Sequence, residues 1–282
     1  MRKIIVPTDF SANAFQAAAW AAGIAVRTGA IVYLLHAMDQ ATDPILEPVA
    51  LDNTYLEQYN REQFQRLRSV RQRIGGQDQR LITELRLSKG MAADAIIAFS
   101  EKERDDLIVM GTHGSGGIKE LLIGSVAADV IARSRIPVLT IPAEYTFRIP
   151  KILLLAARKF ERDLMPLRVP VLFARTLGAR IELLTFIKEG RGREEAQVDS
   201  ASALNHYQEY LQQVLPDIRF SAHRLEGKDF QESLNRYCQE HSVDMVVLFN
   251  HPRNFLEKLC SRNNTKRTVF QSDVPVLVLP GE

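Results

Sequence analysis

Apolar residues in the first half of the chain follow two alternating periods. Short runs rich in β-branched residues predict buried strands, and they fall at 3–7, 31–38, 81–87, 107–110 and 137–141. Between them, apolar residues recur three and four positions apart, which predicts helices over 11–28, 55–73 and 125–133, with another after Gly90. Strands and helices that alternate in this way imply right-handed crossovers and a parallel sheet covered on both faces. The first half therefore predicts a doubly wound α/β domain.

The first predicted helix carries signals at both of its ends. Ser11 is placed to act as its N-cap, and Gly29 is placed to adopt the left-handed conformation just past its last turn. One apolar face is predicted to pack on the sheet, and it consists of Phe15, Ala18, Ala19, Ala22 and Val26.

The second half of the chain repeats the first. Three pairs of segments align, namely 29–35 with 178–184, 106–110 with 244–248, and 136–141 with 274–279. The last two pairs share one offset of 138 residues, which indicates a duplicated domain rather than a solenoid. Pro142 and Pro150 flank a short segment without periodicity. We therefore predict one domain at 1–146 and a second at 147–282.

Composition and charge exclude several classes of protein. The 282 residues are 46% hydrophobic and 25% charged, with a formal net charge of +2, which argues against nucleic acid or an anionic membrane as the main partner. No apolar run is long enough to cross a bilayer, and Asp9 interrupts the N-terminal apolar stretch too early for a signal peptide. Only two cysteines occur, which predicts a reducing, cytoplasmic setting.

A glycine-rich stretch between the strand at 107–110 and the helix at 125–133 carries the candidate chemistry. Gly111 and Gly114 allow the backbone to turn sharply and to approach a ligand closely. Gly124 and Ser125 stand at a helix N-terminus, whose free N–H groups favour an anion such as phosphate. The stretch is neither a Walker loop nor a dinucleotide fingerprint. Without a P-loop lysine, it should hold a nucleotide but support phosphoryl transfer poorly.

These residues are similar to the Gly-x2-Gly-x9-Gly-Ser pattern of ATP-binding universal stress proteins. The opening segment 5–11 and the segments 106–114 and 136–139 also resemble that family. The resemblance implies two doubly wound five-stranded parallel-sheet domains of strand order 3-2-1-4-5, similar to the adenine-nucleotide alpha-hydrolases. It also implies adenine contacts from Pro7, Thr8, Asp9, the backbone of Ala37 and Met110. Ribose and phosphate contacts would come from Gly111, Gly114, Gly124, Ser125 and Val126.

The second half departs from this pattern. At the same offset, the four motif residues are replaced by Phe249, Pro252, Arg262 and Asn263. The strand that opens this half runs into Arg158 and lacks the Pro-Thr-Asp sequence. Phe and Pro in place of two glycines should fill the phosphate space. We therefore predict that ATP binds to the first domain alone, as in a nucleotide-binding stress or regulatory protein.

Several alternatives stay open at this stage. The chain could be a slow ATPase or nucleotide hydrolase, although no catalytic nucleophile and base are recognisable, or an interaction module without any ligand. Asp9 could serve only as a turn residue, and His113 is interpreted as a solvated side chain. The resident nucleotide could be ATP, ADP or AMP, with or without Mg²⁺.

Other chemistry-bearing residues have plainer interpretations. Cys238 and His241 lie three positions apart, but they do not form a standard zinc spacing, so we predict no metal site. The arginines between 61 and 73 are interpreted as a solvated or domain-facing surface rather than a nucleic-acid contact. By the family resemblance, the strands 137–141 and 275–279 would join the two halves, and a homodimer through them is open.

Overall fold

The computed structural model describes residues 1–38, 53–75, 78–103, 107–112, 124–156, 163–189, 194–250 and 273–280, with side chains from residue 56 in the second helix and from residue 202 in the sixth. The elements of the first half are β1 (Lys3–Pro7), α1 (Ala12–Thr28), β2 (Ile31–Met38), α2 (Asn53–Gly75), β3 (Ile82–Lys89), α3 (Ala92–Glu103), β4 (Leu107–Gly111), α4 (Ser125–Arg133) and β5 (Val138–Ile141). The described elements of the second half are β6 (Ile152–Ala156), α5 (Arg168–Leu177), β7 (Arg180–Lys188), α6 (Glu194–Val214), β8 (Phe220–Gly227), α7 (Phe230–Glu240), β9 (Met245–Asn250) and β10 (Val276–Pro280).

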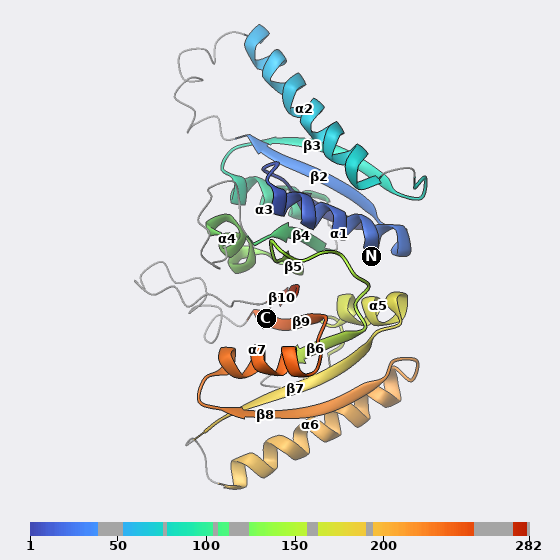
Figure 1. Cartoon of the computed structure of the whole chain (residues 1–282), viewed down its shortest axis with the longest axis vertical. Helices are drawn as coiled ribbons and strands as arrows, with labels where there is room; N and C mark the ends of the chain where they lie inside the picture. Colours follow the sequence, from blue (N-terminus) through green and yellow to red (C-terminus); the bar gives the residue numbers. More distant parts are fainter. Residues whose placement is uncertain are drawn as a thin grey trace.

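All of these strands belong to one ten-stranded sheet of order β3-β2-β1-β4-β5-β10-β9-β6-β7-β8. Within the first half the strands are parallel and confirm the predicted order 3-2-1-4-5. The second half has the same order, 8-7-6-9-10. The halves meet where β5 and β10 pair antiparallel, with Leu277 opposite Leu139. Figure 1 shows the two halves on either side of this joint.

Helices cover both faces of the sheet, and each face carries one apolar cluster that continues from one half into the other. The first cluster lies under α1 and α2 in the first half and under α5 and α6 in the second. The second cluster lies under α3, α4 and α7. The two halves therefore share their core across the β5–β10 joint, rather than burying two separate cores. No described helix is both long and apolar enough to span a bilayer.

Helix α1 begins and ends as its sequence predicts. The Ser11 side chain accepts a hydrogen bond from Ala14 N at 3.1 Å, and Gly29 adopts the left-handed conformation with φ of 69°. Its core face, however, differs from the prediction: Phe15, Ala19 and Val26 are only half-buried. The buried apolar positions of this helix are Ala14, Ala17, Ala18, Trp20, Ala21, Ala22, Ile24 and Ala25. This face is broad because α1 packs on the sheet and also contacts α2 and α5.

The segment between the two halves is held against α1 by aromatic contacts. Phe147 packs edge-on against Trp20, with ring centroids 5.9 Å apart, and Trp20 makes a similar contact with Phe173 of α5 at 5.9 Å. A Cβ at Gly23 would lie 2.5 Å from the Phe147 ring, so this helical glycine makes room for that ring. Trp20 therefore lies at a contact between the halves.

Candidate functional site

The carboxyl ends of β1, β2 and β4 meet at one edge of the sheet, because these strands are parallel and adjacent. The chain leaves β1 toward α1 on one face and leaves β4 toward α4 on the other. The strand order therefore reverses between β1 and β4. Ligands of open α/β sheets bind in the crevice that such a reversal creates.

The residues predicted to contact adenine come together at this edge of the sheet. Pro7 and Thr8 are buried at the end of β1, and Thr8 N donates a hydrogen bond to Leu35 O of β2 at 2.9 Å. Ala37 is half-buried two residues further along β2, and Met110 is buried near the end of β4. Backbone pairing of β1 with both neighbours thus brings this predicted set to a common edge.

Asp9 is exposed at the turn that follows β1. One of its carboxylate oxygens, Oδ1, accepts a hydrogen bond from Ser11 N at 3.0 Å. The turn role that the sequence left open is therefore real.

A stack of three side chains that the sequence analysis missed supports the same turn. Phe10 has a φ of 65°, a left-handed conformation that is uncommon for a non-glycine residue. Its ring lies 4.5 Å from the His36 ring, and the Arg66 guanidinium lies 3.9 Å from the Phe10 centroid on the α2 side. The His36 Nδ1–H donates to Thr8 O at 2.8 Å. These contacts hold the turn after β1 against its own backbone strain.

Burial shifts the protonation of His36. Desolvation lowers the pKa of His36 below its ordinary value, and the nearby Arg66 charge lowers it further, whereas the Thr8 carbonyl and Asp9 oppose the shift. The neutral ring that results carries its proton on Nδ1, toward Thr8 O.

The predicted phosphate side begins at Gly111, the last residue of β4. A Cβ at this position would lie 2.6 Å from Asn13 Oδ1 and 3.1 Å from the Asn13 backbone carbon. Glycine is therefore required here because α1 approaches closely, in addition to any approach by a ligand. Gly114 and His113 lie outside the described residues.

Among the described residues, the N-terminus of α4 lacks a capping side chain at its N-cap. Gly124 is its N-cap, with φ of −58° and ψ of 155°, and makes no side-chain capping bond, and the first turn contains no acidic residue. Ser125 and Val126 are exposed. The N–H groups of the first helical turn have no partner within the helix, and the helix dipole favours negative charge there.

The two described ends of the glycine-rich segment are joined at the sheet edge. Gly124 N donates to Thr112 O at 2.5 Å, and Thr112 N donates to Ile141 O of β5 at 3.1 Å. The Asn13 amide also donates, through Nδ2, to Ile141 O at 3.0 Å. We call these four residues, Asn13, Thr112, Gly124 and Ile141, the loop neck.

The corresponding edge of the second half is occupied differently. Phe249 stands where the first half has Gly111, and it is half-buried against the first apolar cluster. The next residue, Asn250, donates through Nδ2 to Ile131 O of α4 at 2.9 Å. Pro252, Arg262 and Asn263, and also His251 and Cys260, lie outside the described residues. Phe249 and Asn250 therefore pack and bond within the protein.

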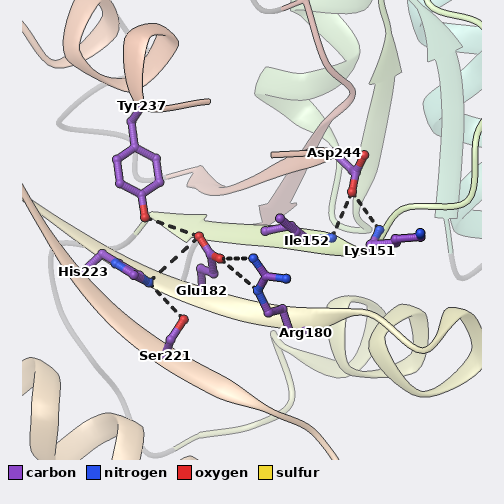
Figure 2. Close-up of polar contacts among 8 residues, drawn as sticks. All are labelled: Lys151, Ile152, Arg180, Glu182, Ser221, His223, Tyr237 and Asp244. Carbon is purple, nitrogen blue, oxygen red and sulfur yellow. Dashed lines mark hydrogen bonds and ion pairs between the residues drawn. The ribbon is translucent and has the colours of Figure 1, made fainter. Parts of the chain in front are cut away.

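A buried polar network distinguishes the second half, and the sequence analysis missed it. Glu182 of β7 is buried and takes Arg180 as its ion-pair partner, with Arg180 Nε donating to Oε1 at 3.0 Å. Tyr237 OH donates to the other oxygen, Oε2, at 3.3 Å (Figure 2). In the first half, Tyr33 stands at the position of Glu182. Its ring instead contacts the Phe99 ring, with centroids 5.7 Å apart. The sequence did contain a signal for this network, because Arg180 and Glu182 are two positions apart on one strand and so lie on the same face.

This network resembles a catalytic triad in composition but not in geometry. His223 Nε2 lies 3.0 Å from Ser221 Oγ and 4.0 Å from Glu182 Oε2, so a single ring nitrogen faces both groups (Figure 2). A Ser-His-carboxylate relay needs the two ring nitrogens to face opposite partners. Burial also raises the pKa of the nearby Cys238 thiol to about 12, which leaves it unreactive. The arrangement is structural.

Among the residues that the structure describes, no three His, Cys, Asp or Glu side chains are grouped so that they could hold a metal ion. His241, which the sequence places three residues after Cys238, stacks its ring on that of Tyr237, with ring centroids 4.1 Å apart. The repeated aspartate of the second half is also structural. Asp244 Oδ2 accepts hydrogen bonds from Lys151 N at 2.8 Å and Ile152 N at 3.1 Å, which fixes the start of β6 (Figure 2).

Comparison with known proteins identifies the family. The sequence model of the universal stress protein family matches residues 1–142 and 167–280. The chain belongs to the universal stress protein family. The two matched segments carry the two halves of the sheet, in agreement with the repeat in the sequence.

Individual universal stress proteins agree with this assignment. One from Methanocaldococcus jannaschii is 34% identical over 140 residues, which cover 50% of this chain and 81% of that protein. One from Thermus aquaticus is 31% identical over 140 residues, which cover 50% of this chain and 98% of that protein. The crystal structure of an Archaeoglobus fulgidus universal stress protein superimposes with a TM-score of 0.68 over 99% of this chain and 96% of that chain, at 16% identity. That likeness supports the tandem fold.

Proposed function

We propose that this universal stress protein binds an adenine nucleotide, with ATP as the ligand, in a first domain of residues 1–146. Adenine would lie against Pro7, Thr8, Asp9, the Ala37 backbone and Met110. Ribose and phosphates would reach Gly111, Gly114, Gly124, Ser125 and Val126. Most of these residues lie at or near the ends of β1, β2 and β4. These three strands end side by side where the strand order reverses, which supports this placement.

One observation carries the proposal: the uncapped N-terminus of α4. Helix N-termini are usually closed by a Ser, Thr, Asp or Asn side chain. Here Gly124 provides no such side chain, and no acidic residue stands in the first turn. A helix N-terminus without a capping side chain favours an anion, which supports placing the phosphates there.

The second domain, residues 147–282, would not bind ATP in this manner. Phe249 stands at the position of Gly111 and packs against the first apolar cluster, so the bare backbone of the first half is missing there. This domain would instead act as a permanent partner of the first, in place of the second subunit of single-domain relatives. The protein would work in the cytoplasm and respond to nucleotide levels rather than turn over substrate.

The direct test is to look for bound nucleotide. The purified full-length chain is denatured, and the supernatant is analysed for adenine nucleotides by absorbance and chromatography. Added ATP, ADP and AMP, each with and without Mg²⁺, are then compared by thermal shift. Protein that releases no nucleotide and shows no shift with any of them would exclude the proposal. Rapid release of inorganic phosphate from ATP would favour a hydrolase instead.

Gly124→Arg should abolish the thermal shift with ATP while the protein stays folded. The arginine side chain would occupy the space in front of the α4 N-terminus, as its counterpart Arg262 would at the same offset in the second half. Circular dichroism checks the fold, and calorimetric titration measures ATP affinity. Lys188→Arg, at the exposed end of β7, is the control. ATP affinity unchanged by Gly124→Arg would contradict the phosphate placement.

A further inference from the structure

A buried side chain at the start of α1 reaches the loop neck, although it belongs to none of the predicted contacts. Asn13 is 6% exposed. Its Nδ2 donates to Ile141 O at 3.0 Å, and its Oδ1 accepts from Thr112 Oγ1 at 3.4 Å. A single amide therefore links the end of β5 to the first residue beyond β4.

The same amide sets the space available at Gly111. A Cβ on Gly111 would lie 2.6 Å from Asn13 Oδ1 and 2.7 Å from Asn13 Cγ. Real Cβ atoms do not make contacts this short, so residue 111 and the Asn13 side chain fit only if residue 111 is glycine. Asn13 is thus in contact with β4, with Thr112 and with β5 at once.

The loop neck determines where α4 begins relative to the sheet. Gly124 N donates to Thr112 O, and Thr112 N donates to Ile141 O, so the α4 N-cap is fixed to the sheet through Thr112. Asn13 bonds both to Thr112 and to Ile141. A shift of Thr112 would therefore move the helix N-terminus.

Asn13 also lies close in sequence to the predicted adenine side. The turn of residues 7–11 leads directly into α1, and the Ser11 side chain caps this helix by accepting from Ala14 N. The first turn of α1 therefore contacts the predicted phosphate side through Asn13, while its preceding turn carries the predicted adenine contacts.

We propose that Asn13 is a positioning residue that fixes the phosphate-binding end of the site relative to the adenine-binding end. This inference rests on the proposed function. It predicts that loss of the Asn13 amide weakens the binding of the phosphates and leaves the binding of adenosine in place. A residue that only stabilised the fold would affect both ligands alike.

The test uses calorimetric titration of the full-length chain with ATP and, separately, with adenosine. Asn13→Ala should weaken ATP binding about tenfold, as expected when one buried hydrogen-bonding group is lost, and change adenosine binding less than about twofold. Gln16→Ala, which removes an amide from the same helix outside the loop neck, should change neither affinity. Equal losses for the two ligands, or no loss for ATP, would overturn the inference.

Asn13→Asp provides a second variant of nearly the same shape. It keeps Oδ1 toward Thr112 but replaces the Nδ2 donor with an oxygen that faces Ile141 O, and it adds negative charge near the predicted phosphates. ATP affinity should fall further than in Asn13→Ala, with adenosine affinity again retained. ATP affinity equal to wild type in this variant would exclude a positioning role even if Asn13→Ala failed to fold.

A double-mutant cycle tests the contact itself. Gly111→Ala should lower the melting temperature in the wild-type background and lower it less in the Asn13→Ala background, where the colliding side chain is gone. Strictly additive shifts would contradict the contact between residues 13 and 111. Wild-type protein that binds neither ATP nor adenosine would instead refute the proposed function, so the two failures are distinguishable.

Discussion

At the scale of single residues, the turn after β1 contains a strained backbone position that neighbouring side chains stabilise. Phe10 adopts a left-handed backbone conformation immediately after the exposed Asp9. A conformation of this kind costs on the order of 1–3 kcal/mol and persists only where surrounding contacts impose it. The rings and charges of His36 and Arg66 supply those contacts. The turn is therefore supported by His36, a side chain whose burial disfavours its charged form.

Stability should fall as the pH drops through the range in which histidine titrates. The pKa of His36 in the folded protein lies below its unfolded value of about 6.5, because burial disfavours the cation. Below about pH 6.5 the unfolded chain therefore binds more protons at this site than the folded chain, so stability is full above this pH and decreases below it.

Melting temperatures between pH 8 and pH 5 measure this effect. His36→Asn keeps a donor toward Thr8 O but cannot titrate, so its acid-side decline should be shallower than that of the wild type. His206→Gln, at an exposed position of α6, should follow the wild-type curve. A wild-type curve that coincides with that of His36→Asn would show that His36 does not contribute.

Among the secondary-structure elements, α4 receives support at both ends from other parts of the chain. Its N-cap is fixed by Thr112 of the loop neck. At its other end, Asn250 of the second half donates to Ile131 O. The last four carbonyls of a helix have no partner inside it, so this amide satisfies one of them. The second half thereby contributes to the helix whose N-terminus would receive the phosphates.

Removing the Asn250 donor should destabilise the protein. Asn250→Ala should lower the free energy of unfolding by about 1 kcal/mol, and Asn250→Asp by more, because a carboxylate cannot donate and meets the negative end of the helix dipole. Guanidinium denaturation measures both, with Asn205→Ala at an exposed position of α6 as the control. An Asp variant as stable as wild type would show that the bond is unimportant.

Elements with signals in their own sequence could be predicted, whereas contacts between distant elements could not. The bounds of β1 and α4 match the prediction because an apolar run and a helix-starting Gly-Ser mark them locally. The buried face of α1 was partly wrong, since Trp20 and Ile24 are covered by neighbours that the helical period does not reveal. Asn13 was missed because one polar residue in a helix has no distinctive spacing. The glycine-rich motif identified Gly111 but could not reveal the close approach of Asn13, which comes from a distant part of the sequence.

Across the whole molecule, the two halves are packed as one body. The apolar cluster under α1 continues through Leu139 and Leu277 into the second half. Trp20, which belongs to the first half, contacts the rings of Phe147 and of Phe173 in α5. Two halves with a shared core are expected to lose their structure together.

Phe173→Ala should therefore destabilise both halves at once. Phe173 is fully buried, so its truncation should cost about 3–5 kcal/mol. Trp20 is the only tryptophan and lies in the first half, so its fluorescence reports on that half while far-ultraviolet circular dichroism reports on both. Both signals should shift to lower denaturant together. Val214→Ala, at a partly exposed site on α6, should shift neither. An unchanged fluorescence midpoint in Phe173→Ala would show that the halves unfold independently.

The antiparallel contact between β5 and β10 is made within a single polypeptide. Separate subunits dissociate on dilution, whereas tethered partners meet at an effective concentration that the connecting segment fixes, in the millimolar range for short connections. The neighbour of the first half is consequently present at any protein abundance. A cell that makes only a few copies of this chain would still have the two halves of each copy paired through β5 and β10.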